Sequence, residues 1–248
     1  MRKRGWFGLA FLSPFALLML APFIYMAYAA DFAALSTVPF PRAFLNSLLL
    51  AGCAAVGQVL TSAAAAYAFA RLRFPGRDRV FVAFLAVLIM PAVVLLVPRF
   101  LIMGTLGWVD SYAGVISTAL VSVWGIFFLR QYFLTLPRDL EDAARVDGAG
   151  EWTIFWRVIL PLVKPALATL GVLAFVDQWK AFLWPLVVTR SPEMQVVEVE
   201  LARFHGVYWS NGPYQMAVAV AATIPLLIVF LVTQRYVIRG LPLDASRS

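Results

Sequence analysis

Charged side chains are scarce in this sequence of 248 residues. Asp, Glu, Lys and Arg make up 13% of it, whereas 62% is hydrophobic and the mean hydropathy is +0.85. Soluble domains carry roughly 25% charged residues, because their surfaces must be solvated. The composition therefore predicts a membrane protein and leaves no room for a separate soluble domain.

Reactive and metal-binding side chains are also scarce. Cys53 is the only cysteine and His205 the only histidine. A single cysteine excludes an intrachain disulfide and a zinc or iron–sulfur site built on cysteines, and we expect His205 to lie in a loop rather than to bind a ligand. The phosphate-binding loop GxxxxGK[ST] is missing, so the chain cannot hydrolyse ATP by that route. We therefore expect no catalytic residue, no metal site and no cofactor in this chain.

Long apolar runs dominate what is present. A bilayer core about 30 Å thick takes about 20 apolar residues per helix, and uninterrupted runs do not fit barrel strands, which alternate apolar and polar residues. The sequence predicts an all-α polytopic membrane protein with one transmembrane domain over residues 1–248. Six transmembrane helices are expected at about 9–30, 46–70, 80–102, 111–133, 165–189 and 214–237.

The basic residues indicate the orientation. Lys and Arg accumulate in the cytoplasmic loops of membrane proteins. Most of the 20 precede the first span or follow the second, fourth and sixth, whereas the alternate loops hold four arginines. We therefore expect both termini and the segment 136–164 to be cytoplasmic. The net charge of +7 reflects this bias and gives no reason to expect binding of nucleic acid.

The first apolar run has a second interpretation. Its basic start and Ala27-Tyr28-Ala29 also fit a cleaved signal peptide. The run is longer than the 7–15 residues of a signal core, so we favour a retained first span.

Several spans contain residues that shape a helix bundle. Ser62, Ala66 and Ala70 recur every four residues in the second span, and small residues on one face let helices approach closely. Prolines inside apolar runs kink helices, and the sequence has five such positions: Pro14, Pro22, Pro91, Pro185 and Pro225. We expect a tightly packed bundle with bent helices.

A polar segment, residues 136–164, separates the fourth and fifth spans. It predicts a first helix whose early turns hold Asp139, Glu141 and Asp142, where acids favour the helix dipole. One face of that helix carries Leu140, Ala143, Ala144 and Asp147, and Gly148 is expected to end it in a left-handed conformation. A second helix is expected from about Glu151, with an apolar stripe of Trp152, Phe155, Trp156 and Ile159. The pattern indicates a surface on which another protein docks.

The order of residues in this segment resembles a known loop. Glu141-Asp142-Ala143-Ala144, Asp147-Gly148-Ala149 and Ile159-Leu160-Pro161-Leu162 are similar to the EAA loop of permease subunits of ATP-binding-cassette (ABC) importers. Weaker matches along the chain resemble the smaller six-span subunit of the maltose-type carbohydrate permeases: Asn46-Ser47, Ala66-Tyr67-Ala68-Phe69-Ala70-Arg71, Met90-Pro91 and Phe182-Leu183-Trp184-Pro185-Leu186.

The resemblance implies a subunit of a transport machine. In that family the loop carries the coupling helices that contact an ATPase subunit. It would therefore place this chain in the bacterial inner membrane with a second homologous permease subunit, two cytosolic ATPase subunits that hold ATP and Mg²⁺, and an extracytoplasmic substrate-binding protein. The implied cargo is a sugar, an oligosaccharide or a polyol derivative such as glycerol phosphate. The implied coupling residues are Glu141, Asp142, Ala143, Ala144, Asp147 and Gly148.

Polar and aromatic residues in the fifth span are candidates for the solute pathway. Asp177 and Lys180 lie three residues apart, so they share a helix face and can pair. Charges within a membrane face protein or water and mark functional candidates. Trp179 and Trp184 lie beside them and could stack on sugar rings, and Asn46 of the second span completes the set of candidates.

Three features depart from the family pattern. Asp142 stands where the family has the glutamate that names the motif. Lys180 and Ala181 replace an asparagine and an acid after Trp179. The first external loop, residues 31–42, is short for this subunit.

Two alternatives stay open. One is an ABC permease for a peptide or an amino acid. The other is a self-contained secondary transporter or channel, which gives no reason for the helices of the polar segment.

Overall fold

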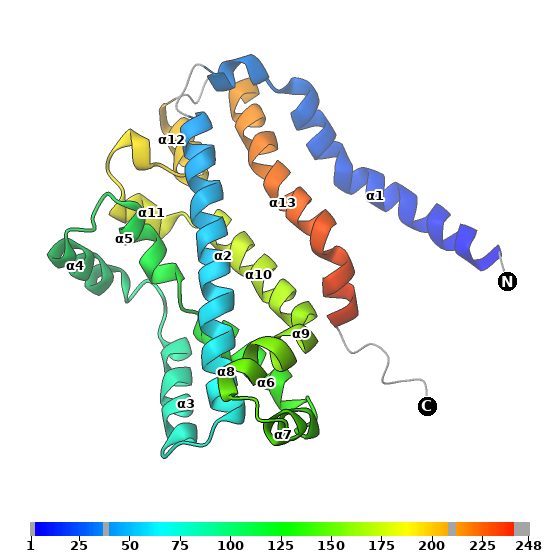
Figure 1. Ribbon diagram of the computed structural model, residues 1–248. Coiled ribbons are helices and arrows are strands. Elements are labelled where there is room, and N and C mark those ends of the chain that lie inside the picture. Colours follow the sequence, from blue (N-terminus) through cyan, green and yellow to red (C-terminus); the bar gives the residue numbers. More distant parts are fainter. Residues whose placement is uncertain (1–2, 37–39, 208–211, 241–248) are drawn as a thin grey trace.

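The computed structural model describes residues 3–36, 40–207 and 212–240, and this part of the chain is helical without a strand (Figure 1). The all-α prediction is confirmed for it. The helices are α1 (Lys3–Ala29), α2 (Phe40–Arg71), α3 (Arg77–Ala86), α4 (Leu96–Leu106), α5 (Tyr112–Ile116), α6 (Val123–Leu134), α7 (Asp139–Val146), α8 (Glu151–Thr153), α9 (Leu160–Leu162), α10 (Lys164–Trp179), α11 (Leu183–Val188), α12 (Val197–Val207) and α13 (Gly212–Gly240). Short 3-10 turns occupy Phe32–Ser36, Val87–Ile89, Ser117–Ala119 and Pro192–Met194, and Ile154–Ile159 form a π-helix.

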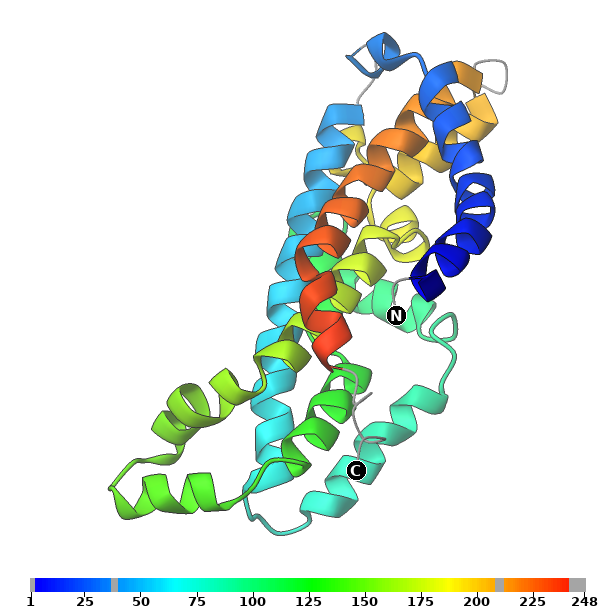
Figure 2. The same ribbon diagram turned by 90° about the vertical axis from the view of Figure 1, so that its right-hand side faces the viewer.

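Helix α2 is the central element. Helices α6 and α10 pack along it, and α13 packs mainly against α10 (Figures 1 and 2). The small-residue stripe of α2 is buried, with Ser62 and Ala66 0% exposed and Ala70 1% exposed. Helix α6 comes so close at Gly125 that an added Cβ would lie 2.7 Å from the Ser62 hydroxyl oxygen. The expected close approach of helices is present, and a glycine on the partner helix makes it possible.

The apolar helices fit a polytopic membrane protein. Among the described residues, three helices are long and apolar enough to cross a bilayer: Phe40–Arg71, Tyr112–Leu134 and Gly212–Gln234. A fourth candidate joins Glu151–Leu162 to Lys164–Trp179 across a bend of 80°. The total of six spans stays a prediction.

Three expected spans are interrupted. The region 111–133 divides into α5 and α6 but still passes as one continuous span. The region 80–102 divides into α3 and α4, and Met90 between them is extended, with φ −79° and ψ 122°. Pro91 follows Met90, and a residue before proline is driven away from the helical conformation. The region 165–189 divides into α10 and α11 at residues 180–182. This break precedes Pro185, so the bend lies earlier in the chain than the proline alone predicted.

Candidate functional site

A buried ion pair attaches α7 to the end of α2. Arg71 Nε lies 2.9 Å from Glu141 Oε1, and the two side chains are 2% and 3% exposed. The same guanidinium donates hydrogen bonds to the carbonyl oxygens of Phe133 at 2.6 Å and Leu136 at 2.8 Å. Arg71 therefore joins the last turn of α2, the end of α6 and the start of the polar segment.

A second arginine, Arg145, links the two helices of the polar segment on their exposed side. Arg145 donates to Asp142 at 2.8 Å and to Glu151 at 2.9 Å, and it lies 3.6 Å from Glu141. The other Glu151 oxygen accepts a hydrogen bond from the Tyr67 hydroxyl of α2 at 2.8 Å. Both halves of the segment are thus tied to α2, one through Glu141 and the other through Glu151.

Burial is the main influence on the pKa of Glu141. Burial raises the pKa of its carboxyl above the ordinary value, and the guanidinium groups of Arg71 and Arg145 oppose this rise. Sequence reasoning grouped Glu141 with exposed docking residues. The structure instead places its side chain against α2, where it pairs with the buried Arg71. Arg71 is far from Glu141 in the sequence, so the pair could not be read from local spacing.

The outer face of α7 is exposed and partly apolar. Asp142 and Ala143 face outward, as expected, and Val146 is 88% exposed. Ala144 instead packs against the core. Trp152 of α8 is 71% exposed, so it and Val146 leave an apolar surface on an otherwise polar segment. Asp147 is exposed as well. The sequence did not single out Val146, although it is the most exposed apolar side chain of the polar segment.

The expected stripe on the second helix is only half correct. Phe155 and Ile159 are buried, but Trp152 and Trp156 are exposed. Ile154 and Val163 complete the buried side instead. The π-helical turn over Ile154–Ile159 rotates successive side chains differently from the α-helical period on which the prediction relied.

Gly148 ends α7 as predicted. Its φ is +81°, and its N–H donates to the Arg145 carbonyl at 3.0 Å while the Ala149 N–H donates to the Ala144 carbonyl at 2.9 Å. These two bonds form a Schellman motif, whose left-handed position favours glycine. The sharp reversal sets the direction in which α8 leaves α7.

A separate cleft of about 900 Å³ lies where α10 breaks. Asp177, Lys180 and Trp184 line it, as the sequence suggested, but the expected Asp177–Lys180 ion pair is not among those found in the described residues. Lys180 follows the last residue of α10, where a cation favours the helix dipole. Both charges are exposed into the cleft, so they are available to a bound molecule.

Trp179 and Asn46 do not line this cleft. Trp179 is 2% exposed, stacks on Phe175 at 5.9 Å and donates its indole N–H to the Ala222 carbonyl at 3.1 Å. The helical period turns it away from Asp177 and Lys180, toward α13. Asn46 is 2% exposed and donates to the carbonyls of Glu193 and Gln195 at 2.7 and 2.8 Å. Both residues are parts of the core and do not line this cleft, so their role in a solute pathway stays a prediction.

Three other residues of the cleft were missed by sequence reasoning. Gln58 of α2, Ser122 before α6 and Trp124 of α6 also line it. Gln58 carries the one long polar side chain inside the second apolar run. This isolated polar residue is a feature of the sequence from which its place in the cleft could have been predicted. Ser122 accepts a hydrogen bond from the Gly125 N–H and caps α6, so it marks the point where the fourth span starts again as a helix.

The chain is similar to transport proteins along most of its length. It is 40% identical over 198 residues to the arabinooligosaccharides transport system permease protein AraQ of Bacillus subtilis, which covers 80% of this chain and 70% of that protein. It is 35% identical over 210 residues to the sn-glycerol-3-phosphate transport system permease protein UgpE of Yersinia pestis, covering 83% and 74%.

Solved structures agree with the fold. A bacterial ABC transporter involved in the import of the acidic polysaccharide alginate superposes with a TM-score of 0.79 at 26% identity, over 96% of this chain and 98% of that one. The bacterial alginate ABC transporter in complex with an alginate pentasaccharide-bound periplasmic protein gives a TM-score of 0.70 at 20% identity, covering 96% of each chain, which supports the fold alone.

The family itself is shown by the sequence. Residues 57–241, most of the chain, match the family described as the inner membrane component of binding-protein-dependent transport systems. This match includes the whole polar segment and the cleft at the break of α10, and it confirms the resemblance seen in the EAA loop. The chain is therefore a multi-pass inner-membrane protein that belongs to the permease components of binding-protein-dependent transport systems.

Proposed function

We propose that this permease forms, with a second homologous membrane subunit, the translocation pathway of an ATP-driven importer for a sugar, an oligosaccharide or a polyol derivative. The observation that carries the proposal is the exposed surface of α7 and α8, attached to α2 through the buried Arg71–Glu141 pair. The similarity to permease proteins of arabinooligosaccharide and sn-glycerol-3-phosphate transport systems supports the cargo class.

In this proposal the polar segment transmits force. Val146, Trp152 and Asp142 lie against a cytosolic ATPase subunit, which holds ATP and Mg²⁺. When the two ATPase subunits approach each other, α7 moves with them. Because Arg71 and Tyr67 tie the segment to α2, and Arg71 also binds the end of α6, the motion reaches the helices that line the cleft.

The rest of the assembly follows from the same proposal. The chain has six spans with both termini in the cytoplasm, and an extracytoplasmic binding protein delivers the solute at the opposite side. In Figure 2 the polar segment lies at one end of the molecule and α12 at the other. Each end then meets a different soluble partner.

Purification in mild detergent tests the assembly. We expect the tagged chain to bring down a second permease and two ATPase subunits, and we expect the loaded binding protein to stimulate ATP hydrolysis. A chain that purifies alone and transports solute without ATP would instead be a self-contained transporter. Binding assays on the partner binding protein would separate carbohydrates from peptides and amino acids.

Gly148→Val should uncouple the importer. A β-branched residue at φ +81° costs about 1–3 kcal/mol, so the turn should open and α7 should lose its orientation. We expect normal membrane insertion but strong loss of transport and of transport-stimulated ATP hydrolysis in proteoliposomes.

Gly150→Val is the matched control. Gly150 has φ −74°, which valine adopts without strain, and an added Cβ there meets nothing within 4 Å. It should keep transport near the wild-type rate. Equal loss in both variants would mean that any bulk in this turn is harmful, and the left-handed conformation would not be the cause.

Lys180→Ala should lower transport or change the preferred solute while the complex still assembles. Lys180 is exposed into the cleft beside Asp177 and Trp184, where a carbohydrate could meet both charge and an aromatic face. Gln178→Ala is the control, because Gln178 lies on the same helix outside the cleft lining. Uptake of labelled solutes by assembled complexes measures the effect, and wild-type uptake by Lys180→Ala would remove this residue from the pathway.

A further inference from the structure

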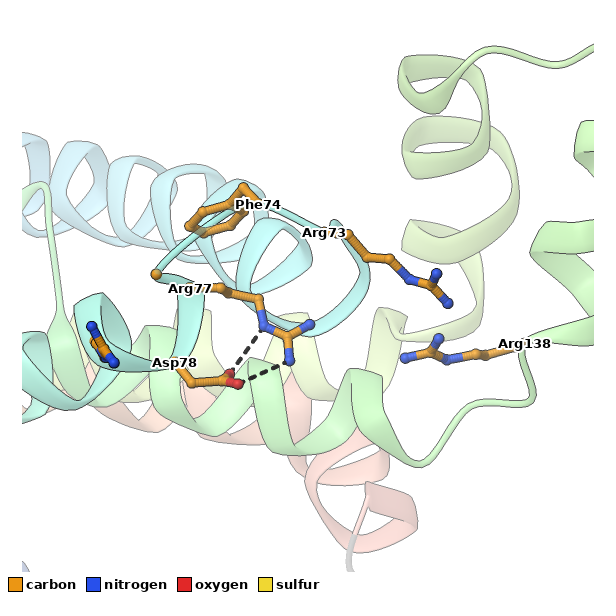
Figure 3. A pocket seen from close by; sticks show the side chains of 7 residues that line it. Arg73, Phe74, Arg77, Asp78 and Arg138 are labelled. Atoms are coloured by element: carbon orange, nitrogen blue, oxygen red, sulfur yellow. Dashed lines mark hydrogen bonds and ion pairs between the residues drawn. The ribbon is translucent and has the colours of Figure 1, made fainter.

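A basic hollow lies between the end of α2, the start of α3 and the turn before α7 (Figure 3). Its volume is about 740 Å³. Four arginines and one aspartate line it, a net charge of +3, together with Phe74 and Gly76. The charged members are Arg73, Arg77, Arg79, Arg138 and Asp78. The hollow is distinct from the cleft at the break of α10.

Three of these arginines, Arg73, Arg79 and Arg138, make no ion pair within 4.0 Å in the described part of the chain. The Asp78 carboxylate already binds Arg77 at 3.0 Å and lies 3.9 Å from Arg130. Figure 3 shows the guanidinium groups of Arg73 and Arg138 side by side, coming from different segments. Among the described residues, neither guanidinium group makes an ion pair or a hydrogen bond, although the charge of Arg138 is felt by the nearby Glu141 carboxyl. Two adjacent cations without a partner form a site that an anion would stabilise.

The hollow opens beside an apolar surface. Phe74 is 39% exposed, and Val80, which shares a face of α3 with the lining residue Arg77, is 51% exposed. Helix α3 starts after Gly76 without a side-chain cap, so its N-terminus adds partial positive charge. Cations at the start of a helix, followed by exposed apolar side chains, match a lipid with its headgroup in the hollow and its acyl chains along α3.

We propose that this hollow binds the phosphate of an anionic phospholipid in the cytoplasmic leaflet. Arg73 and Arg138 hold the phosphate oxygens from two segments, while Phe74 and Val80 contact the acyl chains. Because Arg138 lies directly before α7, a bound lipid would also brace the start of the coupling helix. The site rests on the proposed start of the third span at α3, and it is independent of which solute is carried.

Native mass spectrometry of the detergent-purified complex tests the site. Titration with phosphatidylglycerol should reveal one lipid that binds more tightly than the rest, and phosphatidylcholine should show no such step. Combining Arg73→Ala with Arg138→Ala should weaken that step by about thirtyfold, since each basic residue contributes about 1 kcal/mol to headgroup attraction. Replacing both by lysine should keep most of the binding, because the charge is retained.

The control variant combines Arg157→Ala with Arg190→Ala, which removes two other exposed arginines. It should bind phosphatidylglycerol like the wild type. Equal weakening in this control, or unchanged binding in the Arg73/Arg138 variant, would overturn the site. So would displacement of the lipid by millimolar inorganic phosphate, which would indicate a free-phosphate site. Loss of the ATPase subunits with lipid binding intact would assign the hollow to protein docking instead.

Discussion

Arg71→Met should strongly destabilise the permease. The change removes the cation that lies 2.9 Å from the buried Glu141 carboxylate, leaving only Arg145 at 3.6 Å, and it removes the donor to the carbonyls of Phe133 and Leu136. Breaking a buried pair by removing one partner costs about 3–5 kcal/mol, because the other charge stays buried. We expect a large fall in the apparent melting temperature of the purified complex and loss of transport.

A second change identifies the cause. Arg71→Met combined with Glu141→Leu removes both charges, and replacing a buried pair by apolar residues is often neutral. The double variant should recover most of the lost stability, with a remainder from the two unsatisfied carbonyls. Arg157→Met, at an exposed arginine of the same segment, should change little. If the double variant is as unstable as Arg71→Met, the pair is not what holds α7.

The pH dependence gives an independent readout. Burial already raises the pKa of Glu141, and the guanidinium of Arg71 opposes the rise, so Arg71→Met should raise it further. A carboxyl whose pKa is higher in the folded than in the unfolded state contributes stability at low pH, and that stability is lost as the pH rises through the folded value. Arg71→Met should therefore lose more stability, relative to wild type, at about pH 8 than at about pH 5. Adding Glu141→Gln should abolish this difference.

Val146→Glu should abolish coupling without harming the permease itself. Val146 is 88% exposed on α7, so a carboxylate there remains solvated and costs the free subunit little. Buried in an apolar contact with an ATPase subunit, the same carboxylate would be desolvated at a cost of several kcal/mol. We expect normal insertion and normal association with the second permease, but loss of the ATPase subunits during purification.

Val146→Leu controls for shape. It keeps an apolar side chain at this position and should retain the ATPase subunits and transport. If Val146→Glu also retains them, the exposed face of α7 is not the docking surface. The ATPase would then not contact α7, and motion could not pass from it to α2 through Arg71 as proposed.

The sequence by itself determined the class of the protein and the existence of the polar segment. Apolar runs without charge can only be stable in lipid, and Gly148 after a short polar helix predicts a left-handed stop, which the structure confirms at φ +81°. Both conclusions depend on interactions within a few residues or on composition alone. The same local logic placed Asp177 and Lys180 on one helix face, and both do line one cleft.

Only the tertiary structure decided which residues face inward. Glu141 is buried because Arg71, 70 positions earlier, lies opposite it. Trp179 is in the core because α13 covers its side of α10. The Asn46 amide donates its hydrogen bonds to the carbonyls of Glu193 and Gln195. A side chain's partner is set by which helices pack together, and a period of 3.6 residues defines faces without saying what each face meets. The break after Met90 follows from Pro91 and could be expected from the sequence, whereas the break at residues 180–182 contains no proline and is visible only in the structure.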